Sequence, residues 1–148
     1  MGKTYTLKVG DKTLVKSDLS KLYDEYNEMY FDGRLGKCGF FWLNKTEGDF
    51  GTYHFQNGKS SIGISRNVGW TESTLKEVIV HEMVHMYVTT IDNVEHDGVL
   101  GHGRHFKKQC KRLRDDFGLI IPIHSTLKNK EGFPQNWFEK ILLWLIDR

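Results

Sequence analysis

Apolar and polar positions in the first third of the chain follow two different periods. Residues 3–15 alternate loosely around Gly10 and Asp11, a pattern that predicts a short β-hairpin with its turn there. From Ser17 onward apolar residues recur at helical spacing until Asp32-Gly33, which predicts a helix capped by the serine. The inner face of that helix consists of Leu19, Leu22, Tyr23, Tyr26, Met29 and Tyr30.

Three strand-like stretches follow, rich in aromatic and β-branched residues. They span residues 40–43, 51–55 and 60–65, with turn-rich segments between them. The second and third are joined around Asn57-Gly58, a dipeptide typical of a tight hairpin turn. We therefore expect a small antiparallel or mixed sheet.

Helical spacing returns in the second half of the chain. Thr71 is placed to cap a long helix that runs to about Thr90, and a second helix over residues 104–117 ends at Gly118. Residues 92–103 have no apolar period, which predicts a loop between the two helices. A third helix, opening near Pro134, has an apolar face of Trp137, Phe138, Ile141, Leu142 and Leu145. Sheet and helices together predict an α+β fold.

Length, charge and cysteines exclude several classes of protein. A chain of 148 residues with 39 % apolar and 27 % charged residues fits one globular domain. The net charge of +2 gives only a mild bias toward anionic partners. Cys38 and Cys110 lie far apart and form neither a disulfide framework nor a cysteine zinc knot, which favours a reducing compartment.

The apolar runs also argue against export and membrane insertion. Polar residues follow Met1, so the layout of a secretory signal peptide is missing. The longest apolar run, residues 141–146, is far shorter than the roughly 20 residues that a membrane helix needs. We expect a cytoplasmic protein that does not contact a membrane.

The candidate chemistry lies in the long helix, where residues 81–85 read HEMVH. Histidines four positions apart project from one face of a helix, so His81 and His85 can reach a single metal ion. Glu82 is rotated by roughly 100 degrees around the helix, which suits a carboxylate that holds a zinc-bound water. Zinc lowers the pKa of that water to roughly 7, and Glu82 can take its proton during attack on a peptide carbonyl and return it to the leaving amine.

A catalytic zinc usually has three protein ligands and one open position. Three histidines follow within reach: His96, His102 and His105. His102 lies between two glycines just before a predicted helix, where the backbone can approach closely and the ring can choose its orientation. We therefore predict His102 as the third ligand, with His105 as its competitor.

Other ligand patterns match less well. The metzincin spacing would require glycine at 88 and histidine at 91, where the chain has Val88 and Ile91. A glutamate ligand from a later helix stays open, through Glu95, Glu131 or Glu139. Zinc suits a tetrahedral set of neutral imidazoles, although nickel or cobalt could occupy the same ligands.

The loop and the helix after it carry further polar candidates. Asp92, Glu95 or Asp97 could accept the far N–H of a zinc-bound histidine and fix its tautomer. A basic stretch on the following helix could meet phosphates, although a solvated helix face is the simpler interpretation, so any DNA association is expected to be weak. That stretch consists of Lys107, Lys108, Lys111, Arg112 and Arg114.

Several segments together resemble a known family. HEMVH, a polar loop, and GHG with an aromatic residue three positions beyond are similar to the SprT-like (Spartan-type) zinc metallopeptidases. Upstream, YNEMYFDGRL at residues 26–35 resembles the end of the family's first helix, and residues 41–42, 51–53 and 62–65 are similar to its strand segments. The resemblance covers about residues 17–117.

The resemblance implies a zincin-like fold in which His81, His85 and His102 bind zinc and Glu82 is catalytic. Arg104-His105 stand where the family commonly has Pro-Glu, and Met86 replaces a small residue. The cysteine zinc ribbon that often follows the domain is absent. Residues 1–148 are then one domain with a C-terminal helical extension over about 120–148, and a DNA-repair role is not implied.

We therefore predict a zinc-dependent metallopeptidase that hydrolyses peptide bonds of protein or peptide substrates. The main alternative is a non-catalytic module that keeps zinc as part of its fold and binds nucleic acid or protein. A third possibility is a metal-dependent hydrolase of non-peptide bonds. Glu82 separates the first two, because only the enzyme needs it for turnover.

Overall fold

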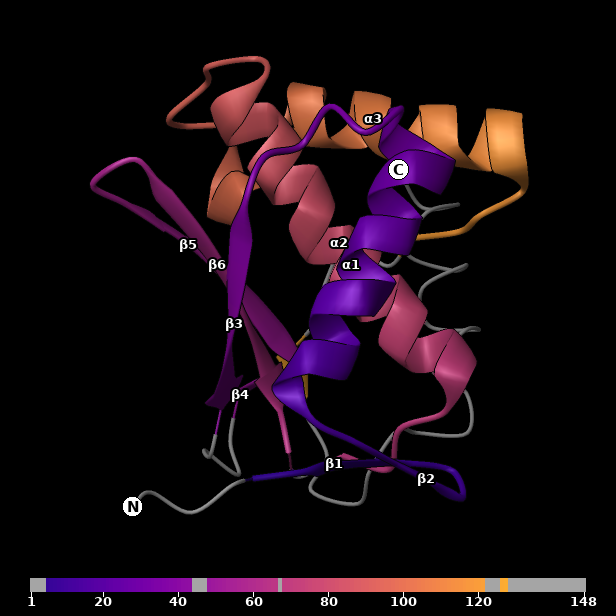
Figure 1. The fold of residues 1–148 in the computed structure, drawn as a ribbon. Helices are drawn as coiled ribbons and strands as arrows, with labels where there is room; N and C mark the ends of the chain where they lie inside the picture. The colour runs from indigo at the N-terminus through magenta and orange to yellow at the C-terminus, as the bar shows by residue number, and fades with distance from the viewer. Residues whose placement is uncertain (1–4, 44–47, 67, 122–125, 128–148) are drawn as a thin grey trace.

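The computed structural model describes residues 5–43, 48–66, 68–121 and 126–127. A sheet stands on one side of the molecule, and helices pack on the other side (Figure 1). The chain begins with an antiparallel hairpin of β1 (Leu7–Val9) and β2 (Lys12–Leu14), as predicted. The N–H of Gly10 donates to the carbonyl of Trp70 at 3.0 Å and so ties the hairpin to the segment before the central helix.

Helix α1 (Lys16–Phe31) covers the sheet with an aromatic face. Tyr23, Tyr26 and Tyr30 are buried as expected, whereas Met29 is exposed. The predicted serine cap is wrong. The N–H of Val15 donates to Asp18 Oδ2 at 2.8 Å, so the helix starts one residue before Ser17.

The sheet is mixed, with strand order β3-β6-β5. Strand β3 (Cys38–Leu43) runs parallel to β6 (Lys59–Ser65), and β5 (Gly51–Gln56) pairs antiparallel to β6 through the predicted turn at Asn57-Gly58. Both turn residues have positive φ, of 53° and 73°. A further antiparallel pair, β4 (Gly48–Asp49) with β7 (Thr126–Leu127), was not predicted.

Helix α2 (Glu72–Thr90) is the centre of the fold. Thr71 caps it as predicted, because its side chain accepts from the N–H of Thr74 at 3.1 Å. The helix packs against β5, β6, α1 and α3, so it is buried on nearly every side rather than along one apolar face. Its buried apolar residues include Leu75, Val78, Ile79, Val80, Met83 and Val84.

Residues 92–103 form the expected loop, which contains a single 3₁₀ turn, η1 (Val99–Gly101). Helix α3 (Arg104–Phe117) follows and ends at Gly118, whose φ is 66° and whose N–H donates to Arg114 O at 2.9 Å. The helix predicted from Pro134 lies outside the described residues. No helix in the described ranges has both the length and the apolar character needed to cross a membrane.

Candidate metal centre

Three histidines converge on one point between α2 and the loop that precedes α3. His81 and His85 project from one face of α2, and His102 comes from the end of the loop. His102 Nε2 lies 3.1 Å from His85 Nε2 and 3.3 Å from His81 Nε2. Sequence spacing predicted this convergence, and among the described residues these three form the only group of potential metal ligands.

The spacing of the three nitrogens can be compared with a zinc coordination shell. Tetrahedral zinc with Zn–N distances of about 2.0–2.1 Å places its ligand nitrogens about 3.3–3.4 Å apart. The separations of His102 Nε2 from His85 Nε2 and His81 Nε2, 3.1 and 3.3 Å, are close to that edge length. The donor set therefore fits a small divalent cation with a preference for imidazole.

A phenylalanine forms the floor of the cluster. The Phe106 ring centroid lies 4.9, 4.6 and 4.7 Å from those of His81, His85 and His102. Phe106 is fully buried, and it comes from the first turn of α3. Its ring contacts all three imidazoles and limits how each can rotate. The sequence contained the signal, an aromatic residue just after GHG, but spacing did not reveal this packing role.

Burial sets the protonation of the cluster. Burial lowers the pKa of His85 to about 4, although the nearby carboxylate of Asp97 acts in the opposite direction. His85 is therefore neutral near pH 7, which is the form of imidazole that binds a metal. His81 is only 1 % exposed, so it too lies in the protein interior.

Glu82 lies beside the histidines rather than among them. Its Oε2 is 3.8 Å from His81 Nε2, and the residue is 2 % exposed. Strand β5 passes close by, because Gly51 has no side chain: a Cβ there would lie 2.8 Å from Val78 Cγ1 and 3.5 Å from Glu82 Cγ. Glu82 therefore sits between the histidine cluster and the outer strand of the sheet.

The loop that carries His102 is closed by Asp97. The carboxylate of Asp97 accepts from the N–H groups of His105 and Phe106, at 3.1 and 2.7 Å, and so caps α3. Its carbonyl accepts from the N–H of Gly103 at 2.7 Å. We call this arrangement of Asp97 with Gly98 and Gly103 the loop clamp. Asp97 was one of three candidates to orient a zinc-bound histidine; its carboxylate accepts from these two backbone N–H groups, and its charge acts on His85.

The glycines of the loop clamp are required by space. A Cβ at Gly103 would lie 2.6 Å from Asp97 Oδ1, and one at Gly98 would lie 2.7 Å from Gly103 Cα. A Cβ at Gly101 would lie 3.2 Å from Cε1 of the His85 ring. The backbone around His102 therefore approaches both the clamp and the cluster as closely as glycine allows.

The competing ligand candidates lie elsewhere. His105 is outside the cluster, with its Nδ1 3.4 Å from Asp92 Oδ2. His96 and Glu95 are exposed on the loop and do not join the cluster. Glu131 and Glu139 lie outside the described residues.

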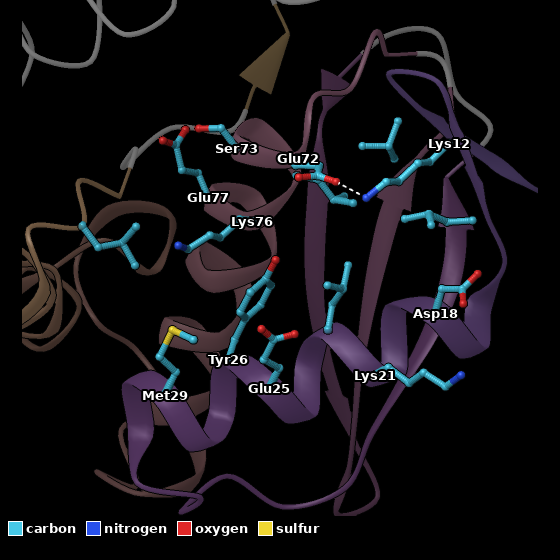
Figure 2. A pocket seen from close by; sticks show the side chains of 15 residues that line it. Lys12, Asp18, Lys21, Glu25, Tyr26, Met29, Glu72, Ser73, Lys76 and Glu77 are labelled. Atoms are coloured by element: carbon cyan, nitrogen blue, oxygen red, sulfur yellow. Dashed lines mark hydrogen bonds and ion pairs between the residues drawn. The ribbon is translucent and has the colours of Figure 1, made fainter.

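A cavity of about 640 Å³ lies between the β1–β2 hairpin, α1 and the first turns of α2, and none of the three histidines lines it. Figure 2 shows its rim, where Lys12 of the hairpin pairs with Glu72 at the start of α2. Glu77 also lines it, and burial raises the pKa of its carboxyl to about 7. The cavity is therefore a feature separate from the histidine cluster.

Comparison with known proteins identifies the family of the chain. The model of the SprT-like family matches residues 19–126, which include the histidine cluster, Glu82 and the loop clamp. The chain belongs to the SprT-like family. The SprT-like match also covers the described elements from α1 to β7, apart from the first three residues of α1 and the last residue of β7.

Curated relatives of this SprT-like chain are metalloproteases by name. It is 26 % identical over 126 residues to the rat DNA-dependent metalloprotease SPRTN and 25 % identical to the human one, with 82 % of the chain and 25 % of each relative covered. It is 27 % identical over 130 residues to the DNA-dependent metalloprotease dvc-1 of Caenorhabditis elegans, covering 34 % of that protein. The chain thus spans about a quarter to a third of the length of these relatives.

The described residues account for two departures of this SprT-like chain from the family pattern, those at Met86 and at Arg104-His105. Met86 is buried, and its sulfur accepts from the Tyr23 hydroxyl at 3.5 Å, so α1 receives the longer side chain. Arg104 is exposed at the start of α3, and His105 turns toward Asp92. Neither departure disturbs the three histidines.

Proposed function

We propose that this chain contains a zincin-like domain and acts as a zinc-dependent metallopeptidase on protein substrates. His81, His85 and His102 are the zinc ligands in this proposal, and Glu82 is the catalytic base. The observation that carries it is the convergence of three imidazole nitrogens at 3.1 and 3.3 Å beside a buried glutamate. The names of the relatives support a metalloprotease, and the donor set supports zinc over harder cations.

A zinc ion held there would supply a Lewis acid that acidifies water and polarises a peptide carbonyl. Glu82 takes the proton of the attacking water and delivers it to the nitrogen of the leaving amine. Its position suits that role, because Glu82 is not part of the group of three candidate ligands, yet its Oε2 lies 3.8 Å from His81 Nε2. His81, His85 and His102 would hold a zinc ion and would leave it one position for water or substrate.

The rest of the chain holds these groups in place. Phe106 limits rotation of the three rings, and α2 is buried on nearly every side. The loop clamp fixes the backbone of His102. A site held in this way needs little rearrangement when metal or substrate binds.

The relatives carry "DNA-dependent" in their names, so we include DNA association as a second part of the proposal. The exposed lysines of α3, Lys107 and Lys108, are the contact sites that we propose. The interaction should be weak, because the net charge of the chain is only +2.

Two glutamates of α2 give a matched test of the proposed enzyme. Glu82→Gln should keep its zinc content and lose turnover by about 10²- to 10⁴-fold, because an amide cannot take a proton from water. Glu77→Gln changes another buried glutamate on the same helix and should leave turnover unchanged. Zinc content is measured by elemental analysis, and turnover is measured on an unfolded protein such as casein, with and without a chelator.

The outcomes separate the alternatives. Full turnover in Glu82→Gln would contradict the proposed base. Zinc bound without turnover in the wild type would favour the non-catalytic module, and turnover of esters alone would favour a hydrolase of non-peptide bonds. His102→Ala should lower zinc content, and an unchanged content there would remove His102 from the ligand set.

A further inference from the structure

The turn that leads into His102 exposes two large apolar side chains beside the histidine cluster. Val99 is 83 % exposed and Leu100 is 73 % exposed, the highest values for large apolar residues in the described ranges. Scattered exposed apolar residues are ordinary. These two, however, adjoin Gly101, whose backbone packs against the His85 ring, and Val99 O accepts from the His102 N–H at 3.0 Å.

The backbone of Leu100 is in a conformation that leucine rarely adopts. Its φ is 56° and its ψ is 25°, in the left-handed region that glycine enters freely. The side chain is exposed, so burial in the core does not offset this strain. Glycine would suit the fold at least as well. An outlier of this kind beside a candidate site is a reason to look for a function.

The turn is also fixed at both ends. The loop clamp joins Asp97 to Gly103 by a hydrogen bond of 2.7 Å and packs Gly98 against Gly103. The carboxylate of Asp97 ties the same segment to α3. Val99 and Leu100 cannot turn into the core without breaking these contacts, so they stay at the edge of the cluster.

We propose that Val99 and Leu100 form an apolar contact surface for a substrate side chain next to the scissile bond. The inference rests on the proposed peptidase function and adds a preference to it: peptides with a large apolar residue at that position are favoured. Removal of apolar surface from water drives such a contact. Because the surface is open to solvent, the discrimination between leucine and aspartate should be about tenfold.

The test compares zinc-loaded wild type with Leu100→Gly, which suits the backbone and removes the contact. Peptides carry leucine, serine or aspartate at each position around the scissile bond in turn. The variant should be at least as heat-stable as wild type and bind as much zinc, but lose about tenfold of its preference for leucine at one position. Leu100→Lys should shift that preference toward aspartate.

Met29→Ser is the matched control. Met29 is exposed on α1 and lines the separate cavity, so its loss should not change peptide preference. If Leu100→Gly and Val99→Ser both keep the peptide preference of wild type, the inference is overturned. The peptidase proposal then stays intact.

Failure of the peptidase proposal looks different, because wild type then cleaves none of the peptides. In that case, binding of fluorescent peptides to zinc-loaded Glu82→Gln protein gives the same comparison. If adding Leu100→Gly to the Glu82→Gln protein removes its preferential binding of leucine peptides, the contact surface is supported. If the preference persists, or if no peptide binds, the inference is overturned.

Discussion

Two buried carboxylates of α2 stand in different surroundings. Glu82 lies 3.8 Å from His81 Nε2, where a cation in the cluster would offset the cost of burying its charge. Glu77 is 6 % exposed and lines the cavity beside Lys76. Desolvation raises the pKa of Glu77 to about 7, although the charge of Lys76 acts in the opposite direction. Ionisation of Glu77 therefore destabilises the folded state.

The pH dependence of stability should reveal Glu77. An unfolded glutamate loses its proton near pH 4.3, whereas the folded protein keeps it up to about pH 7. Stability contributed by the protonated group is thus present below the unfolded pKa and is lost as pH rises to about 7. Glu77→Gln should stabilise the metal-free protein by roughly 1–3 kcal/mol at pH 8 and change little at pH 4.

The measurement is chemical denaturation of chelator-treated protein between pH 4 and pH 8.5. Glu25→Gln changes an exposed carboxylate that lines the same cavity and should follow wild type at every pH. Equal stability of Glu77→Gln and wild type at both ends of the range would show that the Glu77 carboxyl is not desolvated.

At the scale of elements, one helix and one loop meet at the histidine cluster. Helix α2 brings His81 and His85, and its burial on nearly every side holds them still. The loop has few buried residues, so the hydrogen bonds of Asp97, rather than burial, hold the segment that carries His102 in place. The geometry of the cluster therefore depends on Asp97, whose carboxylate accepts from backbone N–H groups of α3.

Removal of the Asp97 carboxylate should weaken metal binding. Asp97→Ala loses the cap of α3, which should cost about 0.5–2 kcal/mol of unfolding free energy. It also loosens the loop that presents His102, which should lower zinc affinity by about 10- to 100-fold. Zinc affinity is measured by competition with a chromophoric chelator.

Thr71→Ala is the control, because it removes the cap of α2 far from the loop. It should destabilise the fold by a similar amount and leave zinc affinity within about twofold of wild type. Equal losses of affinity in the two variants would mean that general destabilisation, rather than the loop clamp, is responsible.

Local patterns predicted most of the elements, and long-range pairings escaped them. The caps at Thr71 and Gly118, the turn at Asn57-Gly58 and the HExxH spacing each depend on neighbours in sequence. Whether β3 would run parallel to β6 depends on segments far apart in the chain, and so does the pairing of β4 with β7. No period in the sequence encodes these contacts.

In the candidate site, too, local patterns predicted some features, and others depend on contacts between distant segments. Periodicity placed His81 and His85 together, and glycines pointed to His102. The contact of Phe106 with all three rings and the direction of the Asp97 carboxylate arise from packing between loop and helix. The serine cap failed because Asp18 offered Val15 a better partner.

At the scale of the whole molecule, charge is nearly balanced, and contact with nucleic acid depends on one face of α3. Lys107 and Lys108 are exposed there, and neither forms an ion pair with another residue in the described ranges. Lys111 differs, because its Nζ lies 2.7 Å from Asp115 Oδ2. The described part of the chain therefore has a small basic face that is already partly neutralised.

DNA binding should be weak and strongly dependent on salt. If Lys107 and Lys108 each meet a phosphate of duplex DNA, replacing both by alanine should reduce the slope of log affinity against log salt by about 1.8. Lys111→Ala should have a smaller effect, since Asp115 already competes for that ammonium group. Fluorescence anisotropy with a labelled duplex checks this, and an unchanged slope in the double variant would remove α3 from the proposed DNA contact.

Strand β5 ends the three-stranded sheet on the side where Gly51 brings it against Glu82. Within the described residues its outer backbone edge has no neighbouring strand, and an edge of this kind accepts only an extended partner. If the proposed peptidase binds its substrate along this edge, helices and central strands of a target protein can bind there only after they unfold. Whether the target is folded, more than its amino-acid sequence, would then decide when it is cleaved.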